Sequence, residues 1–239
     1  MPDCIHGLEI PLCDSCFPKA VPEKPKVVRA SSRTPRFAAV ATSKKSINTG
    51  AQRVYHVTHI NNLEGILATG ALLANAAPTV DLSTELTREL RRTARVCADG
   101  RMVSEYIPFY LTPSATLWEQ LREGAVDETR WSPAARAATT SDFVFLVSTV
   151  EALGEESVIA DGDAAHSLTR FATGDSLTRM LERLHDSDDV QEAEALALAP
   201  FPIELVQLVG VSNDRVRDRV RKLTSVKVVV HPPWFVSAE

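Results

Sequence analysis

The chain has 239 residues, 44% of them hydrophobic and 24% charged, with a net charge of −5. This apolar content suffices for a sizeable core, and the length suits one large domain or one domain with an appendage. There is no long uncharged apolar run and no apolar segment at the start, which argues against a membrane span and a signal peptide and predicts a soluble, cytoplasmic protein.

The first 17 residues carry four potential metal ligands. Their pattern is Cys-x-His-x6-Cys-x2-Cys, in which a tight Cys-x-x-Cys turn can present two sulfurs to one ion. In a reducing compartment such a cluster favours metal over disulfides, and a segment this small needs metal to fold. We therefore predict a structural Zn²⁺ knuckle over residues 1–17, with free thiols in a tail as the alternative. The predicted ligands are Cys4, His6, Cys13 and Cys16.

Residues 18–53 are rich in Pro, Ser, Thr and basic side chains, with nine Lys or Arg against the single acid Glu23. They lack periodic apolar positions, which predicts a flexible linker. The remaining domain, residues 54–239, holds 17 basic and 27 acidic side chains, a net charge of −10. The basic segment is either a solvated tether or an arm that follows a phosphate backbone.

The domain opens with VYHVTHINNLEGILATG, which predicts a short strand running directly into a helix. Alternation from Val54 places His56 and Thr58 on one face of the strand. Asn61, with a glutamate three residues later, has the spacing of a capping box, and Gly70 is the expected end of the helix. Polar groups on such a strand can line a pocket for an anionic ligand at the helix N-terminus. The alternative is a half-exposed strand with ordinary polar residues.

The next predicted helix, over residues 83–96, carries a basic face. Like charges at this spacing repel each other, which indicates an anionic partner, although Glu85 and Glu89 can supply part of the neutralising charge. The arginines of this face are Arg88, Arg91, Arg92 and Arg95.

The rest of the domain alternates between strands and helices without an internal repeat. This arrangement predicts an α+β fold, a mixed sheet with peripheral helices. Strands are expected over 106–112, 142–150, 157–160, 190–198, 206–212 and 226–230, helices over 115–122, 176–184 and 213–223, and a loop between residue 122 and residue 140.

Several motifs resemble one family in order and spacing. They are YHVTHINNLEGILATGALLA, RELRRTARV, EYIPFYLTP, an Asp-Gly turn followed by TRF, and EAEALALAPFPIELV. The chain from residue 54 onward resembles the DarT family, DNA ADP-ribosyltransferase toxins that a macrodomain antitoxin normally holds in check. The resemblance implies an ADP-ribosyltransferase-like sheet, NAD⁺ as substrate, a base in single-stranded DNA as acceptor, and an antitoxin partner.

The chemistry of NAD⁺ cleavage calls for a carboxylate. Breaking the bond between nicotinamide and ribose develops oxocarbenium-like positive charge, which a rigidly held carboxylate stabilises. Glu194 opens an apolar strand and matches the glutamate that ends a Gln-Ala-Glu triplet in the family. Glu192 replaces the glutamine of that triplet, so either acid is a candidate, with Glu194 preferred.

The resemblance also assigns the remaining site residues. It gives His56 and Thr58 to the ribose and nicotinamide end of NAD⁺, and one arginine of an adjacent pair to the phosphates and to catalysis, with Arg91 favoured over Arg92. Two aromatic side chains are expected to stack on the nicotinamide or on a base. These are Tyr106 and Tyr110.

Two departures from the family keep alternatives open. An arginine that usually follows the YIPFY motif is absent, and the domain is acidic, which leaves RNA, a free nucleotide or a protein as other acceptors. The altered triplet leaves open a catalytically degenerate, zinc-tethered module that only binds nucleic acid. Trp118 is either a stacking surface for an unpaired base or part of the core.

Overall fold

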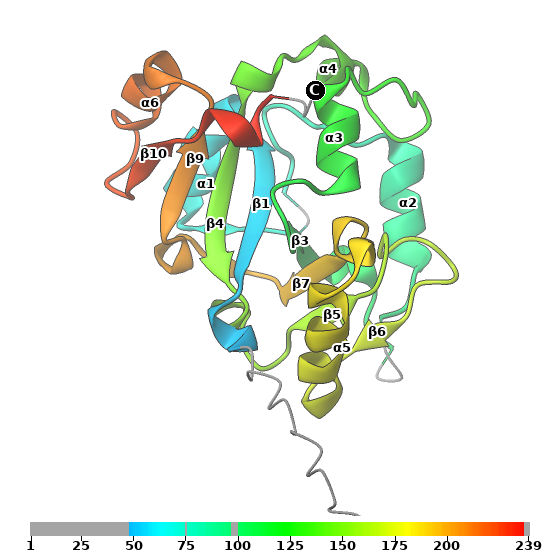
Figure 1. Ribbon diagram of the computed structural model, residues 1–239. Helices are drawn as coiled ribbons and strands as arrows, with labels where there is room; N and C mark the ends of the chain where they lie inside the picture. Colours follow the sequence, from blue (N-terminus) through cyan, green and yellow to red (C-terminus); the bar gives the residue numbers. More distant parts are fainter. Residues whose placement is uncertain (1–47, 75, 97–99, 237–239) are drawn as a thin grey trace, which may run out of the picture. The chain divides into compact units, whose positions relative to one another are not determined.

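The computed structural model describes residues 48–74, 76–96 and 100–236 (Figure 1). The predicted zinc knuckle, with Cys4, His6, Cys13 and Cys16, and all but the last residues of the predicted linker lie outside the described residues.

An eight-stranded sheet forms the centre of the described domain, with the strand order β10-β9-β4-β1-β3-β7-β5-β6. Neighbouring strands are antiparallel except β9 and β10, which run parallel, so the prediction of a mixed α+β sheet is confirmed. The strands are β1 (Arg53–His59), β3 (Tyr106–Tyr110), β4 (Phe143–Thr149), β5 (Val158–Ala160), β6 (Phe171–Ala172), β7 (Glu194–Leu198), β9 (Leu208–Val211) and β10 (Val228–Val230). A separate ribbon pairs β2 (Ala71–Leu72) with β8 (Phe201–Pro202).

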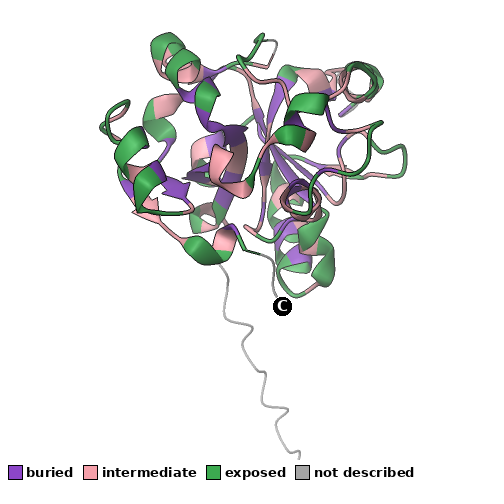
Figure 2. Ribbon diagram, turned by 90° about the horizontal axis from the view of Figure 1, so that it is seen from above, coloured by how far each residue is buried: buried purple, intermediate pink, exposed green. Residues whose placement is uncertain are grey.

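Helices flank the sheet, with α1 and α6 on one face and α3 and α4 on the other (Figure 1). The helix surfaces turned away from the strands are exposed, whereas the strands are mostly buried (Figure 2). Among the described residues every helix is too short or too polar to cross a bilayer. The helices are α1 (Leu63–Thr69), α2 (Glu85–Thr93), α3 (Thr116–Arg122), α4 (Pro133–Ala137), α5 (Asp175–His185) and α6 (Asp214–Val220).

Helix α4 corrects the prediction of a continuous loop up to residue 140. Ser132 caps it by accepting from the amide of Ala135 at 3.1 Å, and Pro133 occupies the first helical position. Both residues are typical of a helix start. The helix is only five residues long, too short for a clear apolar stripe to predict it.

Strand β4 is buried on both faces because it lies inside the sheet. Phe143 and Phe145 pack into one cluster with Trp118, while Val144 and Leu146 pack into the cluster on the opposite face. Trp118 is fully buried, contacts both phenylalanines edge to face, and donates its Nε1–H to a backbone carbonyl at 2.7 Å. The alternative that it stacks on a base is therefore wrong, and it belongs to the core.

The sheet opens between β1 and β3. Strand β1 pairs with β4 along all seven of its residues, but with β3 only through Tyr55 and Tyr110. Beyond this single pair the two strands diverge, and the side chains of His56 and Thr58 lie on the face that the opening exposes. This opening creates the space for the cleft described below.

The start of α1 differs from the predicted capping box. A 3₁₀ turn, Ile60–Asn62, comes first, and the Nδ1 atom of His59 accepts from the amide of Asn61 at 3.1 Å. The helix begins only at Leu63, so Asn61 is not its N-cap. Gly70 ends the helix in the left-handed conformation, with φ of 72°, as predicted.

Candidate active site

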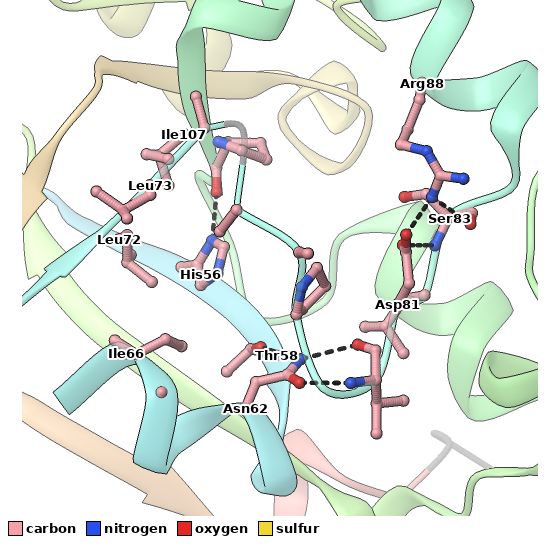
Figure 3. A pocket seen from close by; sticks show the side chains of 18 of the residues that line it. His56, Thr58, Asn62, Ile66, Leu72, Leu73, Asp81, Ser83, Arg88 and Ile107 are labelled. Carbon is pink, nitrogen blue, oxygen red and sulfur yellow. Dashed lines mark hydrogen bonds and ion pairs between the residues drawn. The ribbon is translucent and has the colours of Figure 1, made fainter. Parts of the chain in front are cut away.

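A cleft of about 580 Å³ lies on the opened face of the sheet (Figure 3). Its walls come from β1, α1, the segment 76–83, α2 and β3. This volume is in the range of small-molecule sites. Its lining includes five of the predicted site residues, namely His56, Thr58, Arg91, Arg92 and Tyr106, so the fold brings together residues far apart in the chain.

His56 is held by the strand across the opening. Its Nδ1 atom lies 2.9 Å from the carbonyl oxygen of Pro108, which can only accept, so Nδ1 carries the proton (Figure 3). Burial lowers the pKa of His56, and the bond to Pro108 opposes this only in part. The ring is therefore neutral at pH 7, and its Nε2 atom is an acceptor.

The lowered pKa of His56 predicts a pH-dependent loss of stability. Below the unfolded pKa of about 6.5 the unfolded chain binds a proton that the folded ring does not, so the free energy of unfolding falls as the pH drops. Urea unfolding of the wild type and of His56→Asn at pH 7.5 and 5.5 measures this. The wild type should lose more stability than the variant. Burial also lowers the pKa of His59, and that contribution cancels in the comparison.

Glu194 is the buried acid of the site. It opens β7 opposite Tyr110 of β3, and its side chain is 1% exposed. One carboxylate oxygen, Oε2, accepts from Arg91 at 3.2 Å, and the other, Oε1, accepts from the backbone amide of Ala164 at 3.2 Å. These two donors come from different parts of the chain, and together they hold the carboxylate in one orientation.

Arg91 connects this carboxylate to the cleft. It comes from the last turn of α2, lines the cleft, and bonds Glu194 through Nη1. Its Nη2 atom is buried and has no hydrogen-bond partner among the described residues. A buried guanidinium nitrogen without a partner is costly to the folded state.

The other arginines of the predicted basic face have protein partners. Arg92 pairs with Glu85 and Glu89 on the exposed side of α2, and Arg88 pairs with Glu85 and Asp81. The structure therefore distinguishes the two adjacent arginines that the sequence left nearly equivalent, since only Arg91 contacts Glu194. The fourth arginine of the face, Arg95, lies beyond the end of α2, where its backbone forms an isolated β-bridge with Met102.

The predicted tyrosines have different surroundings. Tyr106 lines the cleft but is only 4% exposed, so little of its ring is open to a ligand. Tyr110 does not line this cleft and lies beside Glu194 in the sheet. Burial and the negative charge of Glu194 raise the pKa of Tyr110 above its usual value. It therefore stays a neutral phenol.

A second, smaller hollow has a volume of about 350 Å³, and Glu194 belongs to the lining of neither this hollow nor the larger cleft. Asp163, which lines the smaller hollow, pairs with Arg130 and precedes the residue whose amide holds Glu194. Glu192 lies at this hollow, exposed, and accepts from the hydroxyl of Thr116 at 2.6 Å. The lining comes from helix α3 and three separate loops, and it includes residues of two motifs noted in the sequence, the Asp-Gly turn followed by TRF and the segment that begins at Glu192. The lining residues are Leu117, Gln120, Arg130, Gly162, Asp163, His166, Thr169 and Glu192.

Comparison with known proteins finds DNA-modifying enzymes. The family model described as ssDNA thymidine ADP-ribosyltransferase, DarT, matches residues 55–236. A DNA ADP-ribosyl transferase of Mycobacterium tuberculosis is 31% identical over 196 residues, covering 71% of this chain and 80% of that protein. The structure of Thermus sp. 2.9 DarT in complex with NAD⁺ has a TM-score of 0.63 at 25% identity, covering 78% of this chain and 98% of that one. The same Thermus protein in complex with ADP-ribosylated ssDNA has a TM-score of 0.66 at 24% identity, over 78% and 97% of the two chains.

Proposed function

The chain belongs to the DarT family of single-stranded-DNA thymidine ADP-ribosyltransferases, and on this premise we propose how its residues carry the transfer. The observation that supports the proposal is the buried carboxylate of Glu194, bonded by Arg91 at the edge of the cleft. NAD⁺ binds in the larger cleft, and the thymine to be modified reaches the same carboxylate from the smaller hollow.

The proposed reaction exchanges one glycosidic bond for another. The bond between the nicotinamide nitrogen and the ribose breaks, and positive charge develops on the ribose. The carboxylate of Glu194 stabilises that charge because two donors fix it and burial shields it from water. Nicotinamide keeps the electron pair of the broken bond and is the second product, while the thymine bonds to the ribose and releases a proton to water.

The cleft supplies complementary contacts for NAD⁺. The Nε2 atom of His56 accepts a hydrogen bond from a ribose hydroxyl. The free Nη2 of Arg91 donates to an oxygen of the dinucleotide, while Arg88 and Arg92 lend positive charge to the pyrophosphate. Tyr106 lines the cleft but is only 4% exposed, so it offers little surface to the ligand.

The smaller hollow offers polar groups suited to a base edge. The amide of Gln120, the guanidinium of Arg130 and the hydroxyl of Thr169 line it, and the aliphatic side chain of Leu117 gives it an apolar wall. A base can hydrogen-bond to the first three groups and pack against the fourth. Glu192 stands at this hollow, which gives it a role with the acceptor and leaves Glu194 as the catalytic acid.

A substitution in the smaller hollow tests this assignment. Gln120→Ala removes a hydrogen-bonding group, so the KM for a single-stranded oligonucleotide should rise about three- to tenfold. The KM for NAD⁺ and the hydrolysis of NAD⁺ without DNA should stay unchanged. Steady-state kinetics with each substrate varied in turn measures both values. A rise in the KM for NAD⁺ alone would place the dinucleotide, and not the base, in the smaller hollow.

Family membership decides between the acceptors considered from the sequence. The matched family acts on single-stranded DNA, and RNA, a free nucleotide or a protein find no support in the comparisons. The family match also argues against a degenerate binding module. We further propose that the enzyme works in the cytoplasm, where NAD⁺ and DNA are both present, and that a macrodomain antitoxin restrains it.

We also retain structural zinc as a proposal for the first 17 residues. Three thiolates and one imidazole form a donor set that suits tetrahedral Zn²⁺. Metal analysis of the purified full chain should find one zinc ion per molecule, and Cys13→Ser should release it without loss of transferase activity. A chain purified under reducing conditions with no zinc would exclude the knuckle.

A further inference from the structure

Asn62 has a role that its position in the sequence does not suggest. It directly precedes α1, yet its side chain makes no helix-capping bond. The residue is 7% exposed and lines the cleft. Its amide makes three hydrogen bonds, all to cleft residues (Figure 3): Oδ1 accepts from the amide of Val80 at 2.7 Å, and Nδ2 donates to the carbonyl of Val80 at 2.9 Å and to Oγ1 of Thr58 at 3.2 Å.

The bonds to Val80 leave one orientation for the Asn62 amide. Only the amide oxygen can accept from the backbone N–H of Val80, and only the amide nitrogen can donate to its carbonyl. The second hydrogen on Nδ2 is therefore directed at Thr58. Because Nδ2 is a donor without acceptor capacity, the Thr58 oxygen must accept in this pair.

This forces the Thr58 hydroxyl to act as a donor elsewhere. Its own hydrogen has no protein acceptor among the described residues, and Thr58 lines the cleft. A buried hydroxyl whose hydrogen lacks a partner is costly, so the hydrogen is available to a ligand in the cleft. A threonine hydroxyl without such a neighbour could either donate to or accept from a ligand. The Thr58 oxygen already accepts from Asn62, so its hydroxyl hydrogen is left to donate to the ligand.

We propose that Asn62 is a positioning residue that sets Thr58 as an obligatory hydrogen-bond donor to an acceptor oxygen of NAD⁺. The proposal rests on the function assigned above to the larger cleft. It also changes the role expected for Thr58, because its contact with the dinucleotide depends on a neighbour that does not itself need to touch the ligand.

The same amide holds one wall of the cleft. Val80 belongs to the segment 76–83, and the next two residues of that segment are held by Ser132, whose hydroxyl donates to the carbonyl of Asp81 at 2.6 Å and whose amide donates to that of Leu82 at 3.0 Å. Substitutions at Asn62 can therefore act through Thr58 or through the wall. The experiment must separate these two routes.

A double-mutant cycle separates them. In Asn62→Asp the carboxylate can only accept, so the Thr58 hydroxyl turns to donate to it and is lost to the ligand. Asn62→Asp and Thr58→Val should each raise the KM for NAD⁺ about fivefold while kcat changes less than about twofold. If Asn62 acts through Thr58, Asn62→Asp should raise the KM little further in the Thr58→Val background. Thr58→Ser, which keeps the hydroxyl, should restore the wild-type KM.

Asn61→Ala is the matched control. This neighbouring asparagine is exposed, and its side chain accepts from Arg219 at 2.7 Å, so its loss should leave the KM for NAD⁺ unchanged. Thermal unfolding of every variant shows whether the fold is retained, and if Asn62→Asp fails to fold, Thr58→Val against Thr58→Ser still measures the donor. Equal effects of Asn62→Asp in the Thr58 and Thr58→Val backgrounds would overturn the proposal in favour of the wall alone.

One further variant distinguishes failure of this proposal from failure of the assigned cleft. His56→Ala should raise the KM for NAD⁺ because the ring lines the same cleft. If His56→Ala changes the KM but Thr58→Val does not, the cleft assignment stands and the proposal for Asn62 is wrong. If neither variant changes the KM for NAD⁺, the dinucleotide binds elsewhere, and both the cleft assignment and the proposal for Asn62 are wrong.

Discussion

Replacing Glu194 by glutamine is expected to reduce ADP-ribosylation of single-stranded DNA by about a hundredfold to a thousandfold. The two side chains have nearly the same shape, but the amide carries no charge to stabilise the developing ribose cation. The substitution should lower kcat, because this interaction strengthens only in the transition state. Single-turnover assays with a thymidine-containing oligonucleotide and saturating NAD⁺ measure it, with mass spectrometry of the adduct as readout.

Glu192→Gln is the matched control for this experiment. Glu192 lies two residues before Glu194, carries the same functional group, and is exposed and bonded to a threonine hydroxyl instead of an arginine. Its replacement should leave NAD⁺ hydrolysis unchanged and affect only steps that involve DNA. Loss of NAD⁺ hydrolysis in Glu192→Gln with retention in Glu194→Gln would reverse the assignment of the two acids.

Arg91→Ala is expected to damage both stability and activity. The variant leaves the carboxylate of Glu194 buried with only the amide of Ala164 as a donor. Removing one partner of a buried ion pair costs about 3–5 kcal/mol, and the remaining amide bond should keep the loss near the lower end of that range. Transfer should fall about a hundredfold or more, because we assign the same guanidinium a contact with the dinucleotide in the cleft. Urea unfolding and the single-turnover assay give the two values.

Two further variants test whether the effect of Arg91→Ala comes from the buried ion pair. Arg92→Ala removes a neighbouring guanidinium that pairs only with exposed acids, so stability should change little and the KM for NAD⁺ should rise only modestly. Combining Arg91→Ala with Glu194→Gln should recover part of the lost stability, because no buried charge is then left unpaired. Activity should not recover. Equal losses of stability in Arg91→Ala and Arg92→Ala would contradict the buried pair described above.

Much of the sheet could be predicted from the sequence because its strands carry strong local signals. The run around Phe145 is apolar on both faces, as a strand inside a sheet requires, and the alternation from Val54 places His56 and Thr58 on one face. The glutamate at the start of β7 could be predicted from its place at the start of an apolar strand together with its match to a family triplet. In each case the information lies within a few neighbouring residues.

Features that depend on partners distant in sequence could not be predicted. The adjacent Asn61 and Asn62 are typical of a helix start. In the structure the side chain of His59 caps the preceding turn, and the side-chain amide of Asn62 bonds to the backbone of Val80. No local spacing distinguishes two adjacent asparagines. In the same way, the sequence favours Arg91 over Arg92 only weakly, and the ion pair across the fold shows that Arg91 contacts the carboxylate of Glu194 while Arg92 pairs with exposed acids.

The position of β1 in the sheet has a consequence for the synthesis of the enzyme. The first strand of the described domain lies in the interior, and its full-length partner β4 is made some time after it. Pairing between segments so far apart in the chain is slow to form, and the segment that carries Glu194 leaves the ribosome later still. A polypeptide whose translation stops before β7 therefore lacks the carboxylate to which we assign the stabilisation of the ribose cation.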